Sequence, residues 1–149
     1  MTDYRELAES LEAISASVKY NISILANASA LIWNAMDRLN WCGFYLMEGG
    51  RLILGPFQGK IACTEIEPGK GVCGTAVVRG ETILVKDVHT FDGHIACDSA
   101  SNSEIVVPVR RNGELFGVLD IDSPDLARFT EEDKAGLELV VSALEKVLK

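Results

Sequence analysis

The sequence predicts an α+β domain in which helices at both ends of the chain flank an antiparallel sheet. Apolar residues recur at helical spacing before Asn40, and the pattern then changes to strands joined by Gly-Gly and Asn-Gly turns. A last helical segment follows Thr130. Hairpins between terminal helices favour an antiparallel sheet over a parallel one. The 149 residues fit one domain, expected to span 1–149, and 48% of them are hydrophobic, enough for a core.

Charge and composition exclude some classes of partner. The formal net charge is −8, and an acidic chain binds phosphate backbones poorly, so we expect no nucleic-acid partner. The opening residues MTDYRELAES lack the cationic and apolar regions of a signal peptide. No apolar run approaches the roughly 20 residues that span a bilayer. We therefore expect a cytoplasmic protein without membrane contact, whose thiols are reduced at rest.

The first part of the chain predicts two helices and a hairpin. Residues 3–39 have a helical pattern, and weaker helix formers over 15–21 predict a break. The strand WCGFYLM then leads through Gly49-Gly50 into RLILG, as in a hairpin. Alternation along this strand puts Cys42 on a large apolar face, so we interpret Cys42 as a buried core thiol.

Trp41 and Tyr45 are expected on the opposite face of that strand, on either side of Gly43. The glycine leaves a gap between two aromatic side chains, and such a gap suits a small apolar group. Packing of both rings in the core explains the same pattern, and the residues alone leave both interpretations open.

The middle of the chain combines turns with a long loop. Turn residues occupy 67–71, a short helix is predicted near 75–79, and a strand over 81–88. Residues 90–103 are small and polar and predict a loop of a length that is usually functional in a compact domain.

Three glycines, Gly69, Gly71 and Gly74, match the spacing of a dinucleotide-binding loop. That motif needs a buried strand before it and a long helix after it, whereas the preceding residues are polar and contain proline. We interpret these glycines as a tight turn that lets Cys73 approach neighbouring backbone.

A second hairpin and a final helix complete the predicted fold. Strands are expected over 104–111 and 114–122, joined by Asn112-Gly113, the preferred pair for a type I′ turn. Thr130 is expected to cap the final helix, because three acidic residues follow it directly.

Three carboxylates gather at one end of this hairpin. Asp120 and Asp122 are two residues apart and share one face of the strand. Pairing centred on the turn places position 104 opposite about 121, so Glu104 is expected beside both aspartates. Like charges at close range raise the pKa of at least one carboxyl, which can then act as a general acid near neutral pH. A solvated strand end is the alternative interpretation.

Three more cysteines lie in the middle third, each in a different local setting: Cys63, Cys73 and Cys97. In a chain expected to stay in a reducing compartment, such thiols indicate thiol chemistry. Their separations of 10 and 24 residues differ from the close pairs of structural zinc sites, so we expect no metal. His89 and His94 are expected to order the loop by hydrogen bonds.

Together these groups fit one class of reaction. Reduction of an S=O or peroxide bond needs a nucleophilic thiolate, a proton donor for the oxygen, and a second thiol that removes the sulfenic acid. The thiols and carboxylates above are candidates for all three tasks.

Several segments also resemble known proteins. GKGVCGTAVVRGETILVKDV, EIVVPVRRNGELFGVLDIDSP and RFTEED resemble a GAF domain over nearly the whole chain. NWCGFYL, LGPFQGKIAC, GVCGTA and DVHTFDGHIACDSASNSEIVVP resemble one GAF family, the free methionine-(R)-sulfoxide reductases. The resemblance implies a six-stranded antiparallel sheet flanked by N- and C-terminal helices, and a homodimer. It also implies reduction of free L-methionine-(R)-sulfoxide, with no cofactor beyond external thioredoxin as reductant.

The same resemblance implies roles for the three thiols. Cys97 would attack the sulfur, Cys63 would resolve the sulfenic acid as a disulfide, and Cys73 would be an auxiliary or second resolving thiol. Cys73 could exchange roles with either of the other two.

The resemblance also implies how substrate is held. The acids Glu104, Asp120 and Asp122 would bind and protonate the sulfoxide oxygen, and Trp41 and Tyr45 would enclose the S-methyl group. Backbone N–H groups in the small-residue loop at Ile95, Ala96 and Asp98 are candidates to hold the substrate carboxylate.

Two alternative functions are compatible with the same sequence. A non-catalytic GAF module would bind a small ligand, and a redox sensor would use the cysteines as a switch without a substrate. A sensor would form its disulfide with peroxide, and methionine sulfoxide would not accelerate that reaction.

Overall fold

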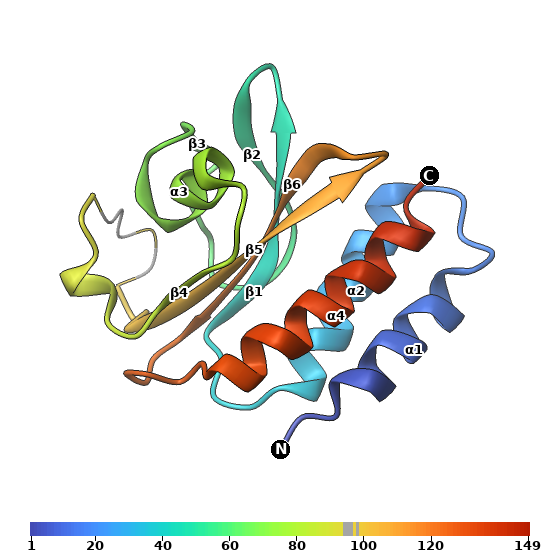
Figure 1. The fold of residues 1–149 in the computed structure, drawn as a ribbon, viewed down its shortest axis with the longest axis horizontal. Coiled ribbons are helices and arrows are strands. Elements are labelled where there is room, and N and C mark those ends of the chain that lie inside the picture. Colours follow the sequence, from blue (N-terminus) through green and yellow to red (C-terminus); the bar gives the residue numbers. More distant parts are fainter. Residues whose placement is uncertain (94–96, 98) are drawn as a thin grey trace.

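The computed structural model describes residues 1–149 except 94–96 and 98 (Figure 1). Its sheet has the strand order β3-β2-β1-β6-β5-β4, and each neighbouring pair is antiparallel. The strands are β1 (Trp41–Glu48), β2 (Arg51–Gly59), β3 (Glu65–Ile66), β4 (Ile83–Val85), β5 (Ser103–Arg111) and β6 (Glu114–Ser123). The helices are α1 (Tyr4–Ser15), α2 (Asn21–Ala35), α3 (Gly71–Arg79) and α4 (Glu131–Val147), with a 3₁₀ turn, η1 (Val88–Thr90). The predicted α+β class is confirmed.

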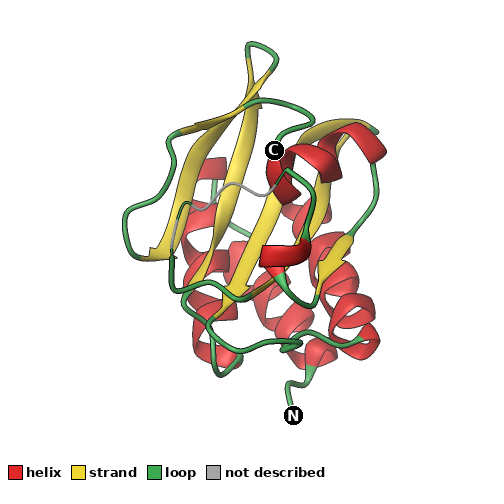
Figure 2. Ribbon diagram, turned by 90° about the vertical axis from the view of Figure 1, so that its left-hand side faces the viewer, coloured by secondary structure: helices red, strands yellow, loops and turns green. Residues whose placement is uncertain are grey.

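The sheet has a different cover on each face (Figures 1 and 2). Helices α1, α2 and α4 pack on one face, and α3 lies on the other with the loops around it. Because strand side chains alternate, one strand supplies residues to both sides. Strand β1 thus contributes Cys42 and Phe44 to the core under the three helices, and Trp41 and Tyr45 to the core on the α3 side.

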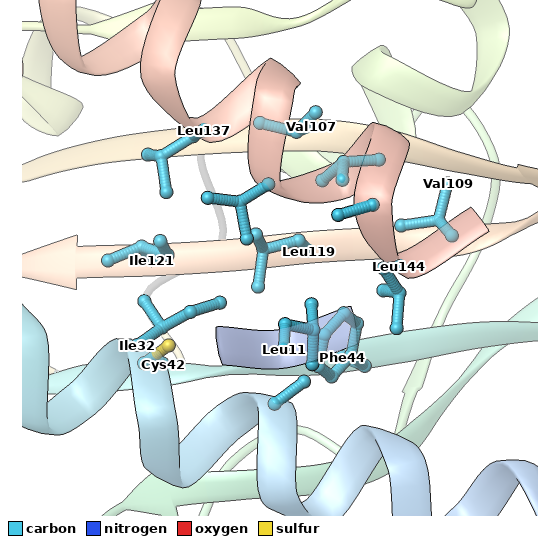
Figure 3. Packing of buried hydrophobic residues seen from close by; sticks show 14 of the residues in the cluster. Leu11, Ile32, Cys42, Phe44, Val107, Val109, Leu119, Ile121, Leu137 and Leu144 are labelled. Carbon is cyan, nitrogen blue, oxygen red and sulfur yellow. The ribbon is translucent and has the colours of Figure 1, made fainter. Parts of the chain in front are cut away.

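Cys42 is a core residue, as its position in the strand predicted. It is 0% exposed and lies beside Ile32 of α2 among the side chains between the helices and the sheet (Figure 3). Burial raises the pKa of its thiol, so it stays neutral. It is therefore unsuited to nucleophilic chemistry, which needs a thiolate.

The ends of the helices also follow the sequence. The predicted break falls between Ser15, the last residue of α1, and Asn21, the first of α2. Thr130 caps α4, and its side chain and that of Asp133 form a reciprocal capping box. Among the described residues, no helix combines the length and the apolar character needed to cross a membrane.

Two elements of the middle segment differ from the prediction. Helix α3 begins at Gly71, earlier than position 75, because Gly74 has no side chain to collide with the Glu67 carbonyl oxygen, which a Cβ would approach to 2.5 Å. The strand predicted over 81–88 is only Ile83–Val85. It ends early because the Asp87 side chain accepts a hydrogen bond from His89 N and starts η1.

The second hairpin contains a β-bulge that the sequence analysis missed. Near the turn, Arg110 pairs with Leu115, whereas the next pair is Val109 with Gly117, so Phe116 is an extra residue in β6. The register beyond the bulge is shifted by one. Glu104 therefore pairs with Asp122, and the predicted partner near position 121 is wrong by one residue.

Candidate active site

A pocket opens on the α3 side of the sheet, between the middle strands, α3 and the loops. Its lining includes seven of the residues singled out from the sequence: Trp41, Tyr45, Cys73, Cys97, Glu104, Asp120 and Asp122. These residues come from β1, α3, β5, β6 and the segment before β5. The fold thus collects aromatic, thiol and carboxyl groups that are far apart in the chain.

Cys63 and Cys97 form a disulfide at this pocket. Cys63 follows β2 and Cys97 precedes β5, and their Cα atoms are 5.4 Å apart. Both residues are half-buried, and Cys97 lines the pocket itself. Two thiols separated by 34 residues are therefore within bonding reach at an accessible position. Cys42 and Cys73 are free and buried.

The three carboxylates form a buried cluster on neighbouring strands. Glu104 on β5 pairs directly with Asp122 on β6, and Asp120 lies two residues along β6 on the same face. Their exposed fractions are only 8%, 9% and 6%. The bulge creates this arrangement, because without the shift Glu104 would share a face with Ile121, which packs under the helices.

Burial and mutual repulsion determine how these acids are protonated. Burial raises the pKa of Glu104 well above its usual range, and the negative charges of Asp120 and Asp122 raise it further. Burial also raises the pKa of Asp120, although hydrogen bonds from Glu104, Cys73 and Asp122 oppose that rise. Glu104 is thus the best candidate to carry a proton at neutral pH and donate it to an oxygen in the pocket. Asp120 Oδ1 is buried without a hydrogen-bond partner among the described residues.

Cys73 sits on α3 against this cluster and is 4% exposed. Burial raises the pKa of its thiol well above the usual value, and the charges of Asp120, Glu104 and Asp122 raise it further. A neutral thiol here can donate to Asp120 but is a weak nucleophile. The ligand atoms of Cys73, Glu104 and Asp120 lie within 4.8 Å of one another, so among the residues that the structure describes this trio is close enough to hold a cation.

The aromatic wall of the pocket is more closely packed than a gap between two rings. The rings of Trp41 and Tyr45 stack at 5.7 Å between centroids, and Trp41 also stacks on Phe57 of β2 at 5.1 Å. Phe57 occupies the space over Gly43, since its Cβ would overlap a Cβ built on that glycine. The predicted gap at Gly43 is therefore filled, and the pocket lies beside the two rings.

The polar ends of both rings bind the chain that carries Cys63. Trp41 Nε1 donates to the Lys60 carbonyl oxygen at 3.1 Å. The Tyr45 hydroxyl donates to the carbonyl oxygen of Cys63 itself at 2.9 Å. The aromatic wall is thus tied directly to one half of the disulfide.

Comparison with known proteins fits this geometry. The family model described as GAF domain matches residues 23–149. Free methionine-R-sulfoxide reductase of Escherichia coli is 53% identical over 145 residues, covering 97% of this chain and 88% of that protein. The structure of fRMsr of Staphylococcus aureus in complex with substrate is 49% identical with a TM-score of 0.95, covering 100% of this chain and 97% of the other. Free methionine-R-sulfoxide reductase of Neisseria meningitidis, also in complex with its substrate, is 44% identical with a TM-score of 0.92, over 97% and 87% of the two chains.

The chain belongs to the free methionine-R-sulfoxide reductase family of GAF domains. The expected GAF fold is therefore confirmed.

Sequence reasoning for this reductase-family chain missed some pocket residues. Lys70 and Ser101 line the pocket, together with the apolar Ala62 and Ile66. Lys70 stands in the glycine turn beside Cys73, and that adjacency was a signal. Ser101 gave none, because its position depends on a hydrogen bond from Asn40 across 61 residues.

The candidates for holding a substrate carboxylate in this family member, Ile95, Ala96 and Asp98, lie outside the described residues, as does His94. His89 has the loop-ordering role predicted for it. Its Nε2 is 2.9 Å from Asn102 Oδ1, and its backbone N–H donates to Asp87.

Proposed function

We propose that the protein reduces free L-methionine-(R)-sulfoxide to methionine, with Cys63 and Cys97 as its redox-active pair. The observation that carries the proposal is the Cys63–Cys97 disulfide at a pocket whose wall holds buried acids with raised pKa values. The substrates of the E. coli and N. meningitidis relatives, as their names give them, support the same reaction.

The first step transfers oxygen from substrate to protein. The Cys97 thiolate attacks the sulfoxide sulfur while Glu104 donates its proton to the sulfoxide oxygen. The oxygen moves to Cys97 as a sulfenic acid, and methionine leaves with two more electrons than the sulfoxide had. Asp120 and Asp122 are proposed to orient that oxygen and to keep the proton on Glu104.

The second step closes the disulfide. The Cys63 sulfur attacks Cys97 Sγ, the S–O bond breaks, and the hydroxyl of the sulfenic acid leaves as water with the proton of the Cys63 thiol. Glu104 regains the proton that the Cys97 thiol lost when it formed the thiolate. The net reaction consumes two thiols and one sulfoxide and yields methionine, one disulfide and one water. An external dithiol protein, proposed to be thioredoxin, then reduces the disulfide by thiol exchange and becomes oxidised itself.

Cys97 is the proposed nucleophile rather than Cys73. Cys97 is half-buried and lines the pocket, whereas Cys73 is buried beside three acids that raise its thiol pKa. A nucleophile needs a thiolate fraction that Cys73 has little means to supply. Cys73 is proposed to assist by donating its S–H to Asp120.

The proposed setting is a reducing compartment, the cytoplasm, because the cycle needs a supply of reduced thioredoxin.

Assembly as a homodimer is also part of the proposal. Tyr20 and Ile22, at the corner between α1 and α2, are exposed at 71% and 69% of their surface and are proposed as part of this interface. Light scattering on the purified protein measures its mass directly.

The test is a coupled assay with thioredoxin, thioredoxin reductase and NADPH. The protein should oxidise NADPH when given free methionine-(R)-sulfoxide and stay inactive with the S epimer. Cys97→Ser should abolish methionine formation. Cys63→Ser should make about one methionine per chain and then stop, and a full steady rate from it would reject the resolving role. Peptide mapping under non-reducing conditions should find Cys63 joined to Cys97 after turnover.

The redox-sensor alternative gives a different result in the same assay. A sensor would form the Cys63–Cys97 disulfide with peroxide at a rate that methionine sulfoxide does not change. Absence of turnover with every methionine sulfoxide, together with peroxide-driven disulfide formation, would reject the enzyme and favour the sensor.

A further inference from the structure

The segment between β2 and β3, which carries Cys63, is fixed along its length. Trp41 Nε1 donates to the Lys60 carbonyl, and the Tyr45 hydroxyl donates to the Cys63 carbonyl. The backbone N–H of Leu54 donates to the Thr64 carbonyl at 3.0 Å. Two of the three donors are therefore side chains of the pocket wall, and both come from β1.

The backbone conformation at the start of this segment also depends on its contact with Trp41. Gly59 has a φ of +133°, and a Cβ on it would lie 2.7 Å from Trp41 Cδ1 and 2.8 Å from the Asn40 carbonyl oxygen. The chain can leave β2 in this direction only because residue 59 has no side chain. Trp41 thus packs on the start of the segment and holds its first carbonyl.

We infer that Tyr45 is a positioning residue for disulfide formation, and that its hydroxyl holds Cys63 within reach of Cys97. The inference rests on the proposed function and deepens it. Enclosing an apolar group requires only the ring, which phenylalanine would supply equally well. The hydroxyl instead reaches the carbonyl of Cys63, 18 residues along the chain. Burial raises the pKa of this hydroxyl, so it remains a neutral donor throughout the working pH range.

The step affected is the attack of the Cys63 sulfur on the Cys97 sulfenic acid, with the loss of water described above. Its rate depends on how often the two sulfur atoms meet in the bonding geometry. Fixing the Cys63 carbonyl restricts the residue whose side chain must move. The same restriction raises the effective concentration of Cys63 at Cys97, and with it the equilibrium stability of the disulfide.

Tyr45→Phe tests the hydrogen bond to Cys63 without removing the aromatic ring from the pocket wall, because only the hydroxyl is lost. The sulfenic acid is trapped with a dimedone reagent after single-turnover reaction with methionine-(R)-sulfoxide. Disulfide formation should slow by roughly twofold to tenfold more than methionine formation does, the range expected from one hydrogen bond. The sulfenic acid should accordingly last longer than in the unchanged protein.

A second measurement needs no substrate. In glutathione redox buffers, the Cys63–Cys97 pair of Tyr45→Phe should shift roughly twofold to tenfold toward the dithiol. Trp41→Phe, which removes the donor to Lys60, should shift the equilibrium in the same direction, and it keeps the test available if Tyr45→Phe fails to fold. Tyr4→Phe is the matched control, because it also removes a half-buried hydroxyl, whose 2.6 Å hydrogen bond to Asp133 lies among the helices.

The outcomes distinguish this inference from the proposed function. If the unchanged protein makes no methionine but Tyr45→Phe still shifts the glutathione equilibrium, the reaction is wrong and the positioning role holds. If Tyr45→Phe shifts neither the equilibrium nor the sulfenic acid lifetime, the positioning role is overturned while the reaction stands. A shift of the same size in Tyr4→Phe would mean that lost stability explains the effect, and would also overturn it.

Discussion

Glu104 shows how one residue depends on its surroundings. Burial and the neighbouring aspartates raise its pKa well above the ordinary value of 4.5. The folded protein therefore binds this proton more tightly than the unfolded chain does, so the contribution of Glu104 to stability is most favourable below about pH 4.5 and is lost as the pH rises through the raised pKa.

Glu104→Gln should remove part of that decline. Each unit of pKa difference is worth about 1.4 kcal/mol, so the free energy of unfolding should fall less steeply as the pH rises above about 4.5 than in the unchanged protein. Methionine formation should fall by roughly 10²- to 10⁴-fold, because a general acid is lost. Urea unfolding across the pH range measures the first effect and the thioredoxin assay the second. Glu114→Gln, at an exposed acid of the same hairpin, should change neither.

Replacing Cys42 should affect stability and not activity, in contrast to replacing Cys63 or Cys97. Cys42→Ser places a hydroxyl in a fully buried apolar site and should lower the free energy of unfolding by about 1–3 kcal/mol. The rate of methionine formation should stay unchanged at temperatures where the variant is folded. Loss of activity in the folded Cys42→Ser protein would contradict the division between a core thiol and pocket thiols.

The sequence could predict residues whose environment follows from strand alternation. Cys42 was assigned to the core and Asp120 and Asp122 to one face on that basis, whereas the place of Glu104 beside them depends on the bulge. The hydrogen bond from the Tyr45 hydroxyl to the Cys63 carbonyl could not be predicted. Its acceptor lies on a segment whose path depends on Gly59 and Trp41. The sequence also could not predict that Phe57 fills the space over Gly43, because Phe57 lies on a neighbouring strand.

At the scale of elements, local signals were reliable where they were strong. The turn at Asn112-Gly113 and the cap at Thr130 are where the sequence predicted them. The sequence analysis missed the bulge at Phe116, although Gly117, an isolated glycine within the strand pattern, was a local signal for it. Strand β4 was overpredicted because the side chain of Asp87 competes with the sheet for the backbone.

The cap of α4 can be tested directly. Thr130→Ala removes the hydroxyl that accepts from Asp133 N at 3.2 Å and breaks the reciprocal box. The free energy of unfolding should fall by about 1 kcal/mol, within the usual 0.5–2 kcal/mol for a lost N-cap. Ser142→Ala, at an exposed site in the same helix, should change it by less than about 0.5 kcal/mol. Equal urea midpoints for both variants would show that the box contributes little.

At the scale of the whole molecule, the disulfide links two parts of the chain 34 residues apart. Closing a loop of this length should stabilise the oxidised protein by about 3–4 kcal/mol in the chain-entropy model. The oxidised form should therefore unfold at a higher temperature than the reduced form, as measured by calorimetry. Cys63→Ser should unfold at the same temperature with and without oxidant, and a remaining difference would point to another disulfide.

The bulge at Phe116 also determines what must be copied to move this chemistry to another protein. In an ordinary hairpin with the same turn, the three acids would be split between the two faces of the sheet, however faithfully their identities were reproduced. A designer who grafts the cluster onto a new antiparallel scaffold must therefore transfer an odd residue in one strand together with the side chains. The site is specified as much by the parity of a residue count as by the residues themselves.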